Sequence, residues 1–461
     1  MRHTSLREAI AARCREGEPI ICSKEGEWSA QALLSARREL PQAFEAGVGS
    51  VVLRFRSPIK LILSLVVLDG RADRILLLSP SVSQKDSDEL LDHFKPQLIL
   101  TDADERGFGP PMLQRPDEST QPKDDGGLGP PPSAVETHWI FATSGTTGRP
   151  KLVAHSFRSL TRSVKPDRRI EGGARWGQLF EMARFAGIQV MLQAIAGGAT
   201  LILPDMREAL HSQLRFLAER GCNALSATPT LWRKILLTAD RSELNLRQVT
   251  LGGEIADDAV LAALKTAFPD ARITHVYAST EAGAAFAVHD GRAGFPASYL
   301  EAPPGGVSLK TRDGRLFVQN CDVTANYLGT GQSFRDDEGY VDTGDAVERR
   351  GDRILFKGRT NGAINIGGNK LFPEQVEHVL LRHPAVRQAR IYAKSSPITG
   401  QLVLAEIVPK GGIRETDRKA LTEELLRFCR TCLPRWQVPA IVRMVDEIRA
   451  NDAGKIERRA G

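Results

Sequence analysis

Long hydrophobic runs are missing from this sequence of 461 residues. The longest apolar run, over residues 61–68, is far shorter than the roughly 20 residues that span a bilayer. The first stretch of the chain, MRHTSLREAIAARC, has no apolar segment of the kind found in signal peptides. We therefore expect a cytoplasmic protein that does not insert into membranes.

Cysteine is also scarce, and the six cysteines are dispersed at positions 14, 22, 222, 321, 429 and 432. Dispersed cysteines in a long chain favour a reducing compartment over a disulfide framework. Cys429 and Cys432 form a C-x-x-C pair, but no second pair with zinc spacing follows. Because the pair lies in a stretch with helical periodicity, we favour chance placement over a metal site.

Neither sign of charge dominates, with 62 Lys and Arg against 56 Asp and Glu, a formal net charge of +6. No long basic run or aromatic-basic platform appears, so a nucleic-acid partner is disfavoured. Basic residues cluster at 349–359 and near the C-terminus. A solvated surface is the preferred interpretation of these clusters, ahead of contact with an anionic ligand.

The order of predicted elements indicates an α/β protein with more than one domain. Helical stretches alternate with short apolar strands over residues 1–100 and 188–300, which is typical of parallel sheets. Residues 306–357 change to hairpins with DG and GD turns, and residues from 359 onward form a new α+β unit. We predict a large N-terminal domain of α/β subdomains plus a small β subdomain (1–358), then a small mobile C-terminal domain (359–461).

Residues 143–151, TSGTTGRPK, join a predicted strand to a predicted helix. Glycines and hydroxyls there allow backbone N–H groups to approach phosphate oxygens closely. The spacing is not that of a Walker loop, because the second required glycine falls on Pro150 and Leu152 replaces the metal-binding hydroxyl. A kinase or P-loop NTPase is therefore a poor fit, and the loop alone is as consistent with a plain surface loop as with a binding site.

Four more segments follow in order and carry chemistry. YASTEAG (277–283) places Thr280 and Glu281 after a predicted strand, at the sheet edge where ligands bind in open α/β folds. A carboxylate there can hold Mg²⁺, which prefers oxygen ligands. Asp345 in YVDTGD offers two oxygens to ribose hydroxyls, Arg359 opens a glycine-containing segment, and NDAGKIERR holds Lys455.

These motifs in this order resemble the adenylate-forming superfamily, which includes acyl-CoA and aryl-CoA synthetases, the adenylation domains of nonribosomal peptide synthetases, and firefly luciferase. The resemblance extends from about residue 138 to the C-terminus. It implies that a carboxylate attacks the α-phosphate of ATP to give an acyl-adenylate and pyrophosphate. A thiol then attacks the adenylate and releases AMP. Positioning and charge stabilisation would supply most of the rate.

The resemblance also implies residue roles. The β- and γ-phosphates would be held by the loop residues Thr143, Ser144, Gly145, Thr146, Thr147 and Gly148. Lys151 matches the basic position of that loop, although an exposed lysine without a function fits it as well. Adenine would lie against Gly252, Gly253 and Glu254, with Tyr277 as an aromatic wall, and Ala278 and Ser279 would also belong to the ATP site.

Three catalytic roles follow from the same resemblance. Thr280 matches the α-phosphate contact, Glu281 the Mg²⁺ carboxylate, and Lys455 the lysine that bridges the attacking carboxylate and the α-phosphate. A compact ammonium suits a point where negative charges converge. Asp345 and Arg359 match the ribose clamp. The cofactors implied are ATP, Mg²⁺ and CoA, or the phosphopantetheine of a carrier protein.

In the superfamily the C-terminal domain rotates between the two half-reactions. Here Gly368 would line the thiol tunnel, and Asn361 takes the hinge position, usually Asp or Lys. Asn and the following Gly362 both tolerate positive φ and could absorb a large backbone rotation. A plain turn at the end of a hairpin is compatible with that role.

The predicted substrate pocket lies in residues 180–199 and includes Arg184, Phe185, Gly187 and Ala278. Phe185 falls where amino-acid-activating relatives carry an Asp for the substrate ammonium. Since a buried cation without a counter-charge is costly, we expect an acid without an α-amino group. Ala278 replaces a usual glycine and would shorten the pocket, whereas Arg315 replaces a usual acid with no consequence that the sequence reveals.

The leading hypothesis is an acid–thiol ligase that forms an acyl- or aryl-CoA. A free-standing adenylation enzyme that loads a carrier protein is the close alternative, since both acceptors present the same thiol arm. A catalytically silent nucleotide-binding relative is disfavoured because Lys455, Glu281, Asp345 and Arg359 are present together. The expected partners are a small carboxylic acid and CoA or a carrier protein, with no nucleic acid and no membrane.

Overall fold

The structure is a computed structural model. It describes the whole chain except residues 1–2, 15–17, 36–47, 103–135, 144–150, 167–169, 325, 367–368, 397–399, 412–413 and 449–461. Every statement below concerns the described residues.

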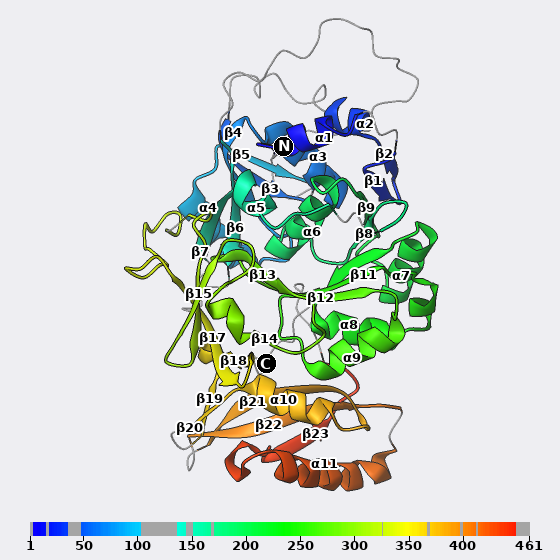
Figure 1. Ribbon diagram of the computed structural model, residues 1–461, viewed down its shortest axis with the longest axis vertical. Helices are drawn as coiled ribbons and strands as arrows, with labels where there is room; N and C mark the ends of the chain where they lie inside the picture. The colour runs from blue at the N-terminus through cyan, green and yellow to red at the C-terminus, as the bar shows by residue number, and fades with distance from the viewer. Residues whose placement is uncertain are drawn as a thin grey trace, which may run out of the picture.

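Two sheets with parallel interiors form the N-terminal part of the chain (Figure 1). The first has the order β5-β3-β4-β6-β7, with β7 antiparallel at its edge. Its strands are β3 (Val48–Arg54), β4 (Ala72–Leu77), β5 (Leu98–Thr101), β6 (His138–Thr143) and β7 (Lys151–Ser156). The β6 strand leads directly into the predicted phosphate loop, and β7 leaves it.

The second sheet has the order β13-β12-β11-β10-β8-β9-β1-β2, in which only the outermost strands, β13 and β2, are antiparallel to their neighbours. Its strands are β1 (Ile21–Ser23), β2 (Gly26–Trp28), β8 (Arg175–Gln178), β9 (Thr200–Leu203), β10 (Ala224–Ala227), β11 (Gln248–Gly252), β12 (Arg272–Ser279) and β13 (Gly283–Val288). The parallel strands β11 and β12 therefore end at the same edge, where the predicted nucleotide residues follow.

Nine helices accompany these two sheets in the described part of the chain. They are α1 (Leu6–Ala11), α2 (Ala30–Ser35), α3 (Pro58–Leu68), α4 (Gln84–Phe94), α5 (Phe157–Thr161), α6 (Phe185–Ile195), α7 (Leu210–Glu219), α8 (Pro229–Leu236) and α9 (Asp258–Ala267). Several begin at a capping hydroxyl or carboxylate, as at Ser57, Thr228 and Asp257, whose side chains accept a backbone N–H of the first turn.

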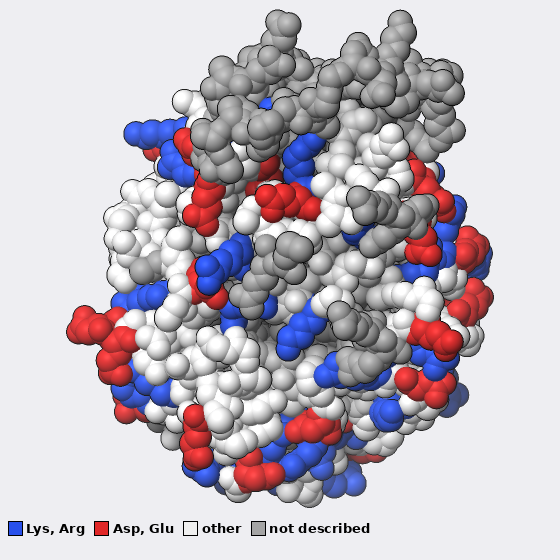
Figure 2. Space-filling view, turned by 45° about the horizontal axis from the view of Figure 1, so that its top comes forward, with Lys and Arg blue, Asp and Glu red and all other residues white. Residues whose placement is uncertain are grey.

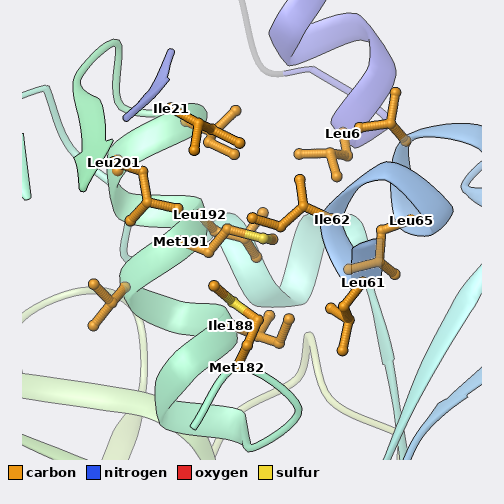
Figure 3. Packing of buried hydrophobic residues seen from close by; sticks show 14 of the residues in the cluster. Leu6, Ile21, Leu61, Ile62, Leu65, Met182, Ile188, Met191, Leu192 and Leu201 are labelled. Atoms are coloured by element: carbon orange, nitrogen blue, oxygen red, sulfur yellow. The ribbon is translucent and has the colours of Figure 1, made fainter. Parts of the chain in front are cut away.

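The helices α3 and α6 are apolar on nearly every side and pack within the core that the two sheets share (Figure 3). A helix that is hydrophobic all round is stable only when it is buried. Ile62 of α3 lies close to Met191 and Leu192 of α6 in Figure 3, and all three are fully buried. This packing fixes the separation of the two sheets and hence of their site-bearing edges.

A five-stranded antiparallel sheet follows, in the order β14-β18-β17-β16-β15. Its strands are β14 (Phe295–Pro296), β15 (Ser308–Arg312), β16 (Arg315–Gln319), β17 (Val341–Arg350) and β18 (Arg353–Arg359). Asp313 and Gly314 form the two-residue turn between β15 and β16, with φ of 51° and 67°. Positive φ at both positions is what a tight hairpin turn of this kind requires. The predicted β subdomain is therefore present.

The C-terminal unit lies below the rest of the chain in Figure 1 and has its own hydrophobic core. Its elements are β19 (Ile364–Ile366), β20 (Asn369–Leu371), α10 (Pro373–Leu381), β21 (Val386–Ser396), β22 (Gly400–Pro409), α11 (Arg418–Cys432) and β23 (Ile441–Met444). Cys429 is buried in this core on α11, whereas Cys432 is exposed, and both are free thiols.

The predicted fold class, α/β with a small β subdomain and a small α+β C-terminal unit, is confirmed. No helix in the described part of the chain is both long enough and apolar enough to cross a bilayer. On the face drawn in Figure 2, acidic and basic side chains are interspersed and do not gather by sign.

Candidate functional site

The predicted site residues follow strands of all three N-terminal sheets. Thr143 ends β6, Gly252 ends β11, Thr280 comes directly after β12, and Asp345 lies within β17. Parallel α/β sheets bind ligands outside the carboxyl ends of their strands, which is where β6, β11 and β12 deliver these residues. The fold thus places one edge of each parallel sheet at a common site.

The β12 strand is irregular where it reaches the site. Its pairing with β13 shifts register between Tyr277 and Ala278, as at a β-bulge. Bulges re-aim side chains and are frequent beside active sites. The chain then turns, with Ser279 Oγ accepting the backbone N–H of Ala282 at 3.0 Å. Thr280 lies in this turn.

His155 on β7 connects the edges of the two parallel sheets. Its Nε2 lies 2.8 Å from the carbonyl oxygen of Thr280, and its Nδ1 lies 3.1 Å from Ser159 Oγ. Because a carbonyl can only accept, Nε2 must carry the proton, and Nδ1 of the neutral ring is then an acceptor. The Ser159 hydroxyl that Nδ1 faces also donates to the Ser156 carbonyl oxygen at 3.0 Å. Burial lowers the pKa of His155 to about 4, so the ring stays neutral near pH 7.

The residues of the predicted ribose clamp lie together. Arg359 Nε donates to Asp345 Oδ1 at 3.1 Å, and the Tyr277 hydroxyl donates to Asp345 Oδ2. Burial and the neighbouring Asp345 carboxylate raise the pKa of Tyr277 well above its usual range, so Tyr277 remains a donor. A carboxylate has about four acceptor positions, so Asp345 keeps capacity for ribose hydroxyls.

The Tyr277 ring belongs to an aromatic stack. It lies nearly parallel to the rings of Phe286 and Phe356, with centroid distances of 5.2 Å to each. Stacks of this geometry add packing energy beyond area burial and fix the plane of the ring. The role of Tyr277 as an adenine wall stays a prediction.

The turn after β11 has a structural explanation as well as a predicted function. Gly253 adopts φ of +81°, a conformation that favours glycine. Glu254 accepts the backbone N–H of Thr230 in the first turn of α8 at 2.9 Å. The carboxylate of Glu254 therefore stabilises the start of α8, and the backbone of Gly252 and Gly253 remains the part of this turn that can face a base.

The predicted pocket segment forms a tight turn before α6. An added Cβ on Gly187 would lie 2.2 Å from the carbonyl oxygen of Glu181, so only glycine fits there. Arg184 pairs with Glu181 at 3.1 Å and also reaches Ser81 Oγ at 3.2 Å. Phe185 contacts the His155 ring, with centroids 5.2 Å apart. The pocket residues are thereby linked to the Thr280 turn.

At the other end of the phosphate loop, Thr143 and Lys151 face each other across the β6–β7 pair. The Thr143 hydroxyl is buried and has no hydrogen-bond partner among the described residues. Buried hydroxyls without a partner are uncommon, and a catalytic role or a bound water or ion is among their explanations. Lys151 lies over the Tyr327 ring, with its Nζ 4.4 Å from the ring centroid.

Asp257 is the point where a charged contact links the C-terminal unit to the N-terminal part. Asp257 at the start of α9 pairs with Arg233 on α8, and His378 of α10 places its Nδ1 3.6 Å from Asp257 Oδ2. Burial opposes the charged carboxylate, but His378 and Arg233 prevail and lower the pKa of Asp257 to about 2. Asn361 lies in a short 3₁₀ turn after β18 and is exposed.

Several predicted residues lie outside the described part of the chain. They are Ser144, Gly145, Thr146, Thr147, Gly148, Gly368 and Lys455. Their roles stay predictions. Of the described residues, the structure joins Tyr277, Asp345 and Arg359 in one hydrogen-bonded group.

Sequence reasoning missed two residues, His155 and Tyr327. His155 carries a weak signal, a lone histidine at the start of the helix predicted to follow the phosphate loop. Tyr327 lies in a segment without strong periodicity. It contacts Lys151, which is 176 positions away in the sequence and comes near only in the folded chain.

Comparison with known proteins supports the prediction drawn from the motifs. The sequence model described as AMP-binding enzyme matches residues 64–322, more than half of the chain, and that of the AMP-binding enzyme C-terminal domain matches residues 375–455. A 2-succinylbenzoate–CoA ligase of Bacillus cereus is 26% identical over 83% of this chain and 82% of its own. An isonitrile lipopeptide synthase of Streptomyces coeruleorubidus is 27% identical over 86% of this chain but only 28% of its own.

Solved structures with the same fold include two ligand complexes. A variant of E. coli MenE with bound OSB-AMS superposes with a TM-score of 0.76 at 22% identity, covering 96% of this chain and 95% of the other. The anthranilate CoA ligase AuaEII with anthranoyl-AMP superposes with a TM-score of 0.78 at 16% identity, covering 99% and 96%. These likenesses show the fold.

Proposed function

We propose, on the premise that this chain belongs to the AMP-binding enzyme family, that it activates a carboxylic acid with ATP and transfers the acyl group to the thiol of CoA. Family membership confirms two predictions: the chain is a member of the adenylate-forming superfamily, and it is an AMP-forming ligase. The identity of the acid and of the thiol are the parts that we propose.

The observation that carries the proposal is the group formed by Tyr277, Asp345 and Arg359 beside the turn that holds Thr280. A partly buried carboxylate held by one phenol and one guanidinium keeps acceptor positions for a vicinal diol. Such a group binds the ribose of a nucleotide and sets the distance from sugar to Thr280. Thr280 then lies where the α-phosphate belongs.

In the first half-reaction the substrate carboxylate oxygen attacks the α-phosphorus of ATP. The bond from that phosphorus to the bridging oxygen breaks, and pyrophosphate leaves. Thr280 donates to the α-phosphate, and Lys455 neutralises the charge that converges there. In the second half-reaction the thiol sulfur attacks the acyl carbon, the thiol proton is lost, and the bond to AMP breaks.

Glu281 would hold Mg²⁺ together with phosphate oxygens and water. The described residues contain no cluster of three His, Cys, Asp or Glu arranged for a metal, so one carboxylate and the substrate would make up the donor set. That donor set suits Mg²⁺, which keeps several waters and binds through one or two carboxylates. When bound, the ion would neutralise the phosphate charge and favour departure of pyrophosphate.

We propose an acyl or aryl acid without an α-amino group, with an aryl acid preferred. Phe185 contacts Phe141 and His155 and offers no carboxylate to an ammonium. The nearby Glu181 is already paired with Arg184. The names of the related 2-succinylbenzoate and anthranilate ligases point to aromatic acids in those proteins.

The C-terminal unit, residues 359–461 in our division of the chain, would rotate about Asn361 between the half-reactions. Release of the contact between His378 and Asp257 would accompany that rotation. Gly368 would then line the path of the thiol.

The direct test is a product analysis with ATP, Mg²⁺, a panel of acids and either CoA or a phosphopantetheinylated carrier protein. We expect an acyl-CoA and an equal amount of AMP for at least one acid. Acyl transfer to the carrier protein alone would favour the free-standing adenylation enzyme, a possibility consistent with the similarity to a peptide-synthase-type relative. Formation of ADP in place of AMP would overturn the proposal.

A further inference from the structure

Helix α10 lies on the side of the C-terminal unit that faces the N-terminal part of the chain (Figure 1). It packs beside β18, where an added Cβ on Gly358 would clash with the carboxylate of Glu374 in the first turn of α10. Lys357 Nζ lies 6.0 Å from the centroid of the Phe372 ring, just before the helix. The start of α10 is thereby held close to β18, and the next turn of the helix reaches α8 and α9.

Asp257 is the residue that this next turn meets. Its Oδ1 accepts the backbone N–H of Val260 at 2.9 Å and so caps α9. Its Oδ2 pairs with Arg233 of α8 and lies 3.6 Å from His378 Nδ1 of α10. Of these three contacts, only that with His378 crosses between the two parts of the chain. The other two hold the carboxylate in place whether or not the C-terminal unit is docked.

The two partners differ in how readily they change charge. Burial opposes the ionisation of Asp257, but His378 and Arg233 hold its pKa at about 2, so the carboxylate is charged near neutral pH. The His378 side chain is 38% exposed, against 11% for Asp257, so water can exchange a proton with the ring. Histidine is the side chain that ordinarily changes charge between about pH 5 and 8. The attraction across the contact therefore strengthens when the ring takes up a proton.

Other charged groups on the neighbouring elements do not replace Asp257 as the partner of His378. Asp258 accepts the backbone N–H of Ala293 at 2.8 Å, and Glu377 accepts that of Ile391 at 2.9 Å inside the C-terminal unit. Glu374 lies against β18 at Gly358. The remaining charged groups on α8, α9, β18 and α10 are cations, which repel a protonated imidazole and cannot pair with it: Lys234, Lys265, Arg353, Lys357, Arg359 and Arg382.

We propose that His378 is a protonation-dependent latch, whose charge opposite Asp257 favours the docked arrangement of the C-terminal unit seen in this structure. The inference rests on the proposed function, in which that unit rotates between the two half-reactions. Protonation favours the half-reaction that the docked arrangement serves and slows the other, so the balance between the two steps depends on pH. Because the contact is partly exposed, its effect on the ratio of docked to rotated molecules should be about threefold.

Two substitutions fix the charge of the latch. His378→Arg carries a positive charge at every pH, whereas His378→Gln carries none. Asp257→Asn removes the charge of the acceptor and keeps an oxygen that can cap α9. The matched control is His383→Gln, because His383 pairs with Glu424 at 3.2 Å entirely within the C-terminal unit.

The readout is single-molecule energy transfer between dyes on Cys321 and Cys432, exposed free thiols that lie one in each part of the chain. Cys14→Ser removes the remaining exposed thiol from every variant. Between about pH 5.5 and pH 8, we expect the ratio of docked to rotated molecules to fall about threefold in the protein with native His378. His378→Arg should keep the low-pH ratio throughout, and His378→Gln the high-pH ratio.

A ratio that does not change with pH in the protein with native His378 would overturn the latch. An equal change in His383→Gln and His378→Gln, or a pH dependence that persists in Asp257→Asn, would also overturn it. Thermal unfolding of each variant distinguishes these results from a loss of fold. In single-turnover measurements, His378→Arg should change the rates of the two half-reactions in opposite directions at pH 8, and parallel changes would contradict the latch.

The energy-transfer measurement needs no substrate, so it is independent of the proposed function. Pyrophosphate exchange by the unlabelled wild-type protein tests that function separately. An active wild type with a ratio that ignores pH refutes only the latch. An inactive wild type whose ratio follows pH and the charge at position 378 refutes the proposed function and supports the latch.

Discussion

His155 Nε2 lies 2.8 Å from the carbonyl oxygen of Thr280 and joins the β7 edge of one parallel sheet to the turn after β12 of the other. Only the tautomer of the neutral ring with its proton on Nε2 satisfies this bond, since the carbonyl is an acceptor. The imidazole thus fixes the backbone of the turn from which, in the proposed function, the Thr280 hydroxyl contacts the α-phosphate.

Substitution of His155 should therefore affect the chemistry more than the binding of substrate. His155→Phe keeps an aromatic ring beside Phe185 but leaves the Thr280 carbonyl without its donor. We expect kcat of pyrophosphate exchange to fall about tenfold or more, with a smaller change in KM for ATP, because small misplacements of reacting groups are costly. The exposed His211→Ala is the control, and an equal loss there would remove His155 from this role.

The same histidine predicts a pH dependence of stability. Its pKa falls from an ordinary 6.5 to about 4 in the folded protein, so only the unfolded chain binds a proton between these values. Neutral His155 therefore contributes to the free energy of unfolding fully above pH 6.5. As the pH falls from 6.5 to 4, this contribution decreases by about 3 kcal/mol. Denaturant unfolding gives the free energy of unfolding of wild type and of His155→Phe at pH 7 and pH 4. The change between the two pH values should be larger for wild type, and the difference between the two changes is the contribution of His155.

The comparison with His155→Phe is needed because Asp69 acts in the opposite direction. Burial raises the pKa of Asp69 to about 6, so its contribution is present below its ordinary 3.8 and lost as the pH rises through 6. Both proteins share Asp69, and its effect cancels in the difference. Identical slopes for the two proteins would contradict a buried neutral His155.

Asp345 provides a test of the ribose clamp. Asp345→Asn keeps an oxygen for the Tyr277 hydroxyl but removes the charge that holds Arg359. Since hydrogen bonds to a charged acceptor are about twice as strong as neutral ones, we expect KM for ATP to rise about tenfold. Asp352→Asn, an exposed carboxylate in the turn after β17 that pairs with Arg292, should leave KM for ATP unchanged. Similar effects of both substitutions would argue against the clamp.

Substitution of Lys455 should affect the first half-reaction and not the second. Lys455→Ala should lower the rate of adenylate formation by about two orders of magnitude or more, because a charge aimed at the transition state is lost. Thioester formation from a supplied acyl-adenylate should remain near the wild-type rate. Single-turnover measurements of each step decide the matter, and equal loss in both would exclude the proposed role.

The sequence indicated the alternation of strands and helices where apolar periodicity was strong, as over residues 188–300, which contain β12 and α9. Asp345 and Arg359 were found because each belongs to a local motif. His155 and Tyr327 were missed because their significance comes from distant partners, Thr280 and Lys151, which only the folded chain brings near. The stretch after the phosphate loop was predicted as a helix from 155 onward, but it first extends β7 to Ser156.

The central claim is that this chain forms an acyl-adenylate. Carboxylate-dependent exchange of labelled pyrophosphate into ATP measures that step alone, without any thiol acceptor. Across a panel of aryl, acyl and amino acids, we predict exchange with at least one aryl or acyl acid, none above background with α-amino acids, and loss of exchange in Lys455→Ala. Absence of exchange across the whole panel, with nucleotide binding intact, would contradict the account.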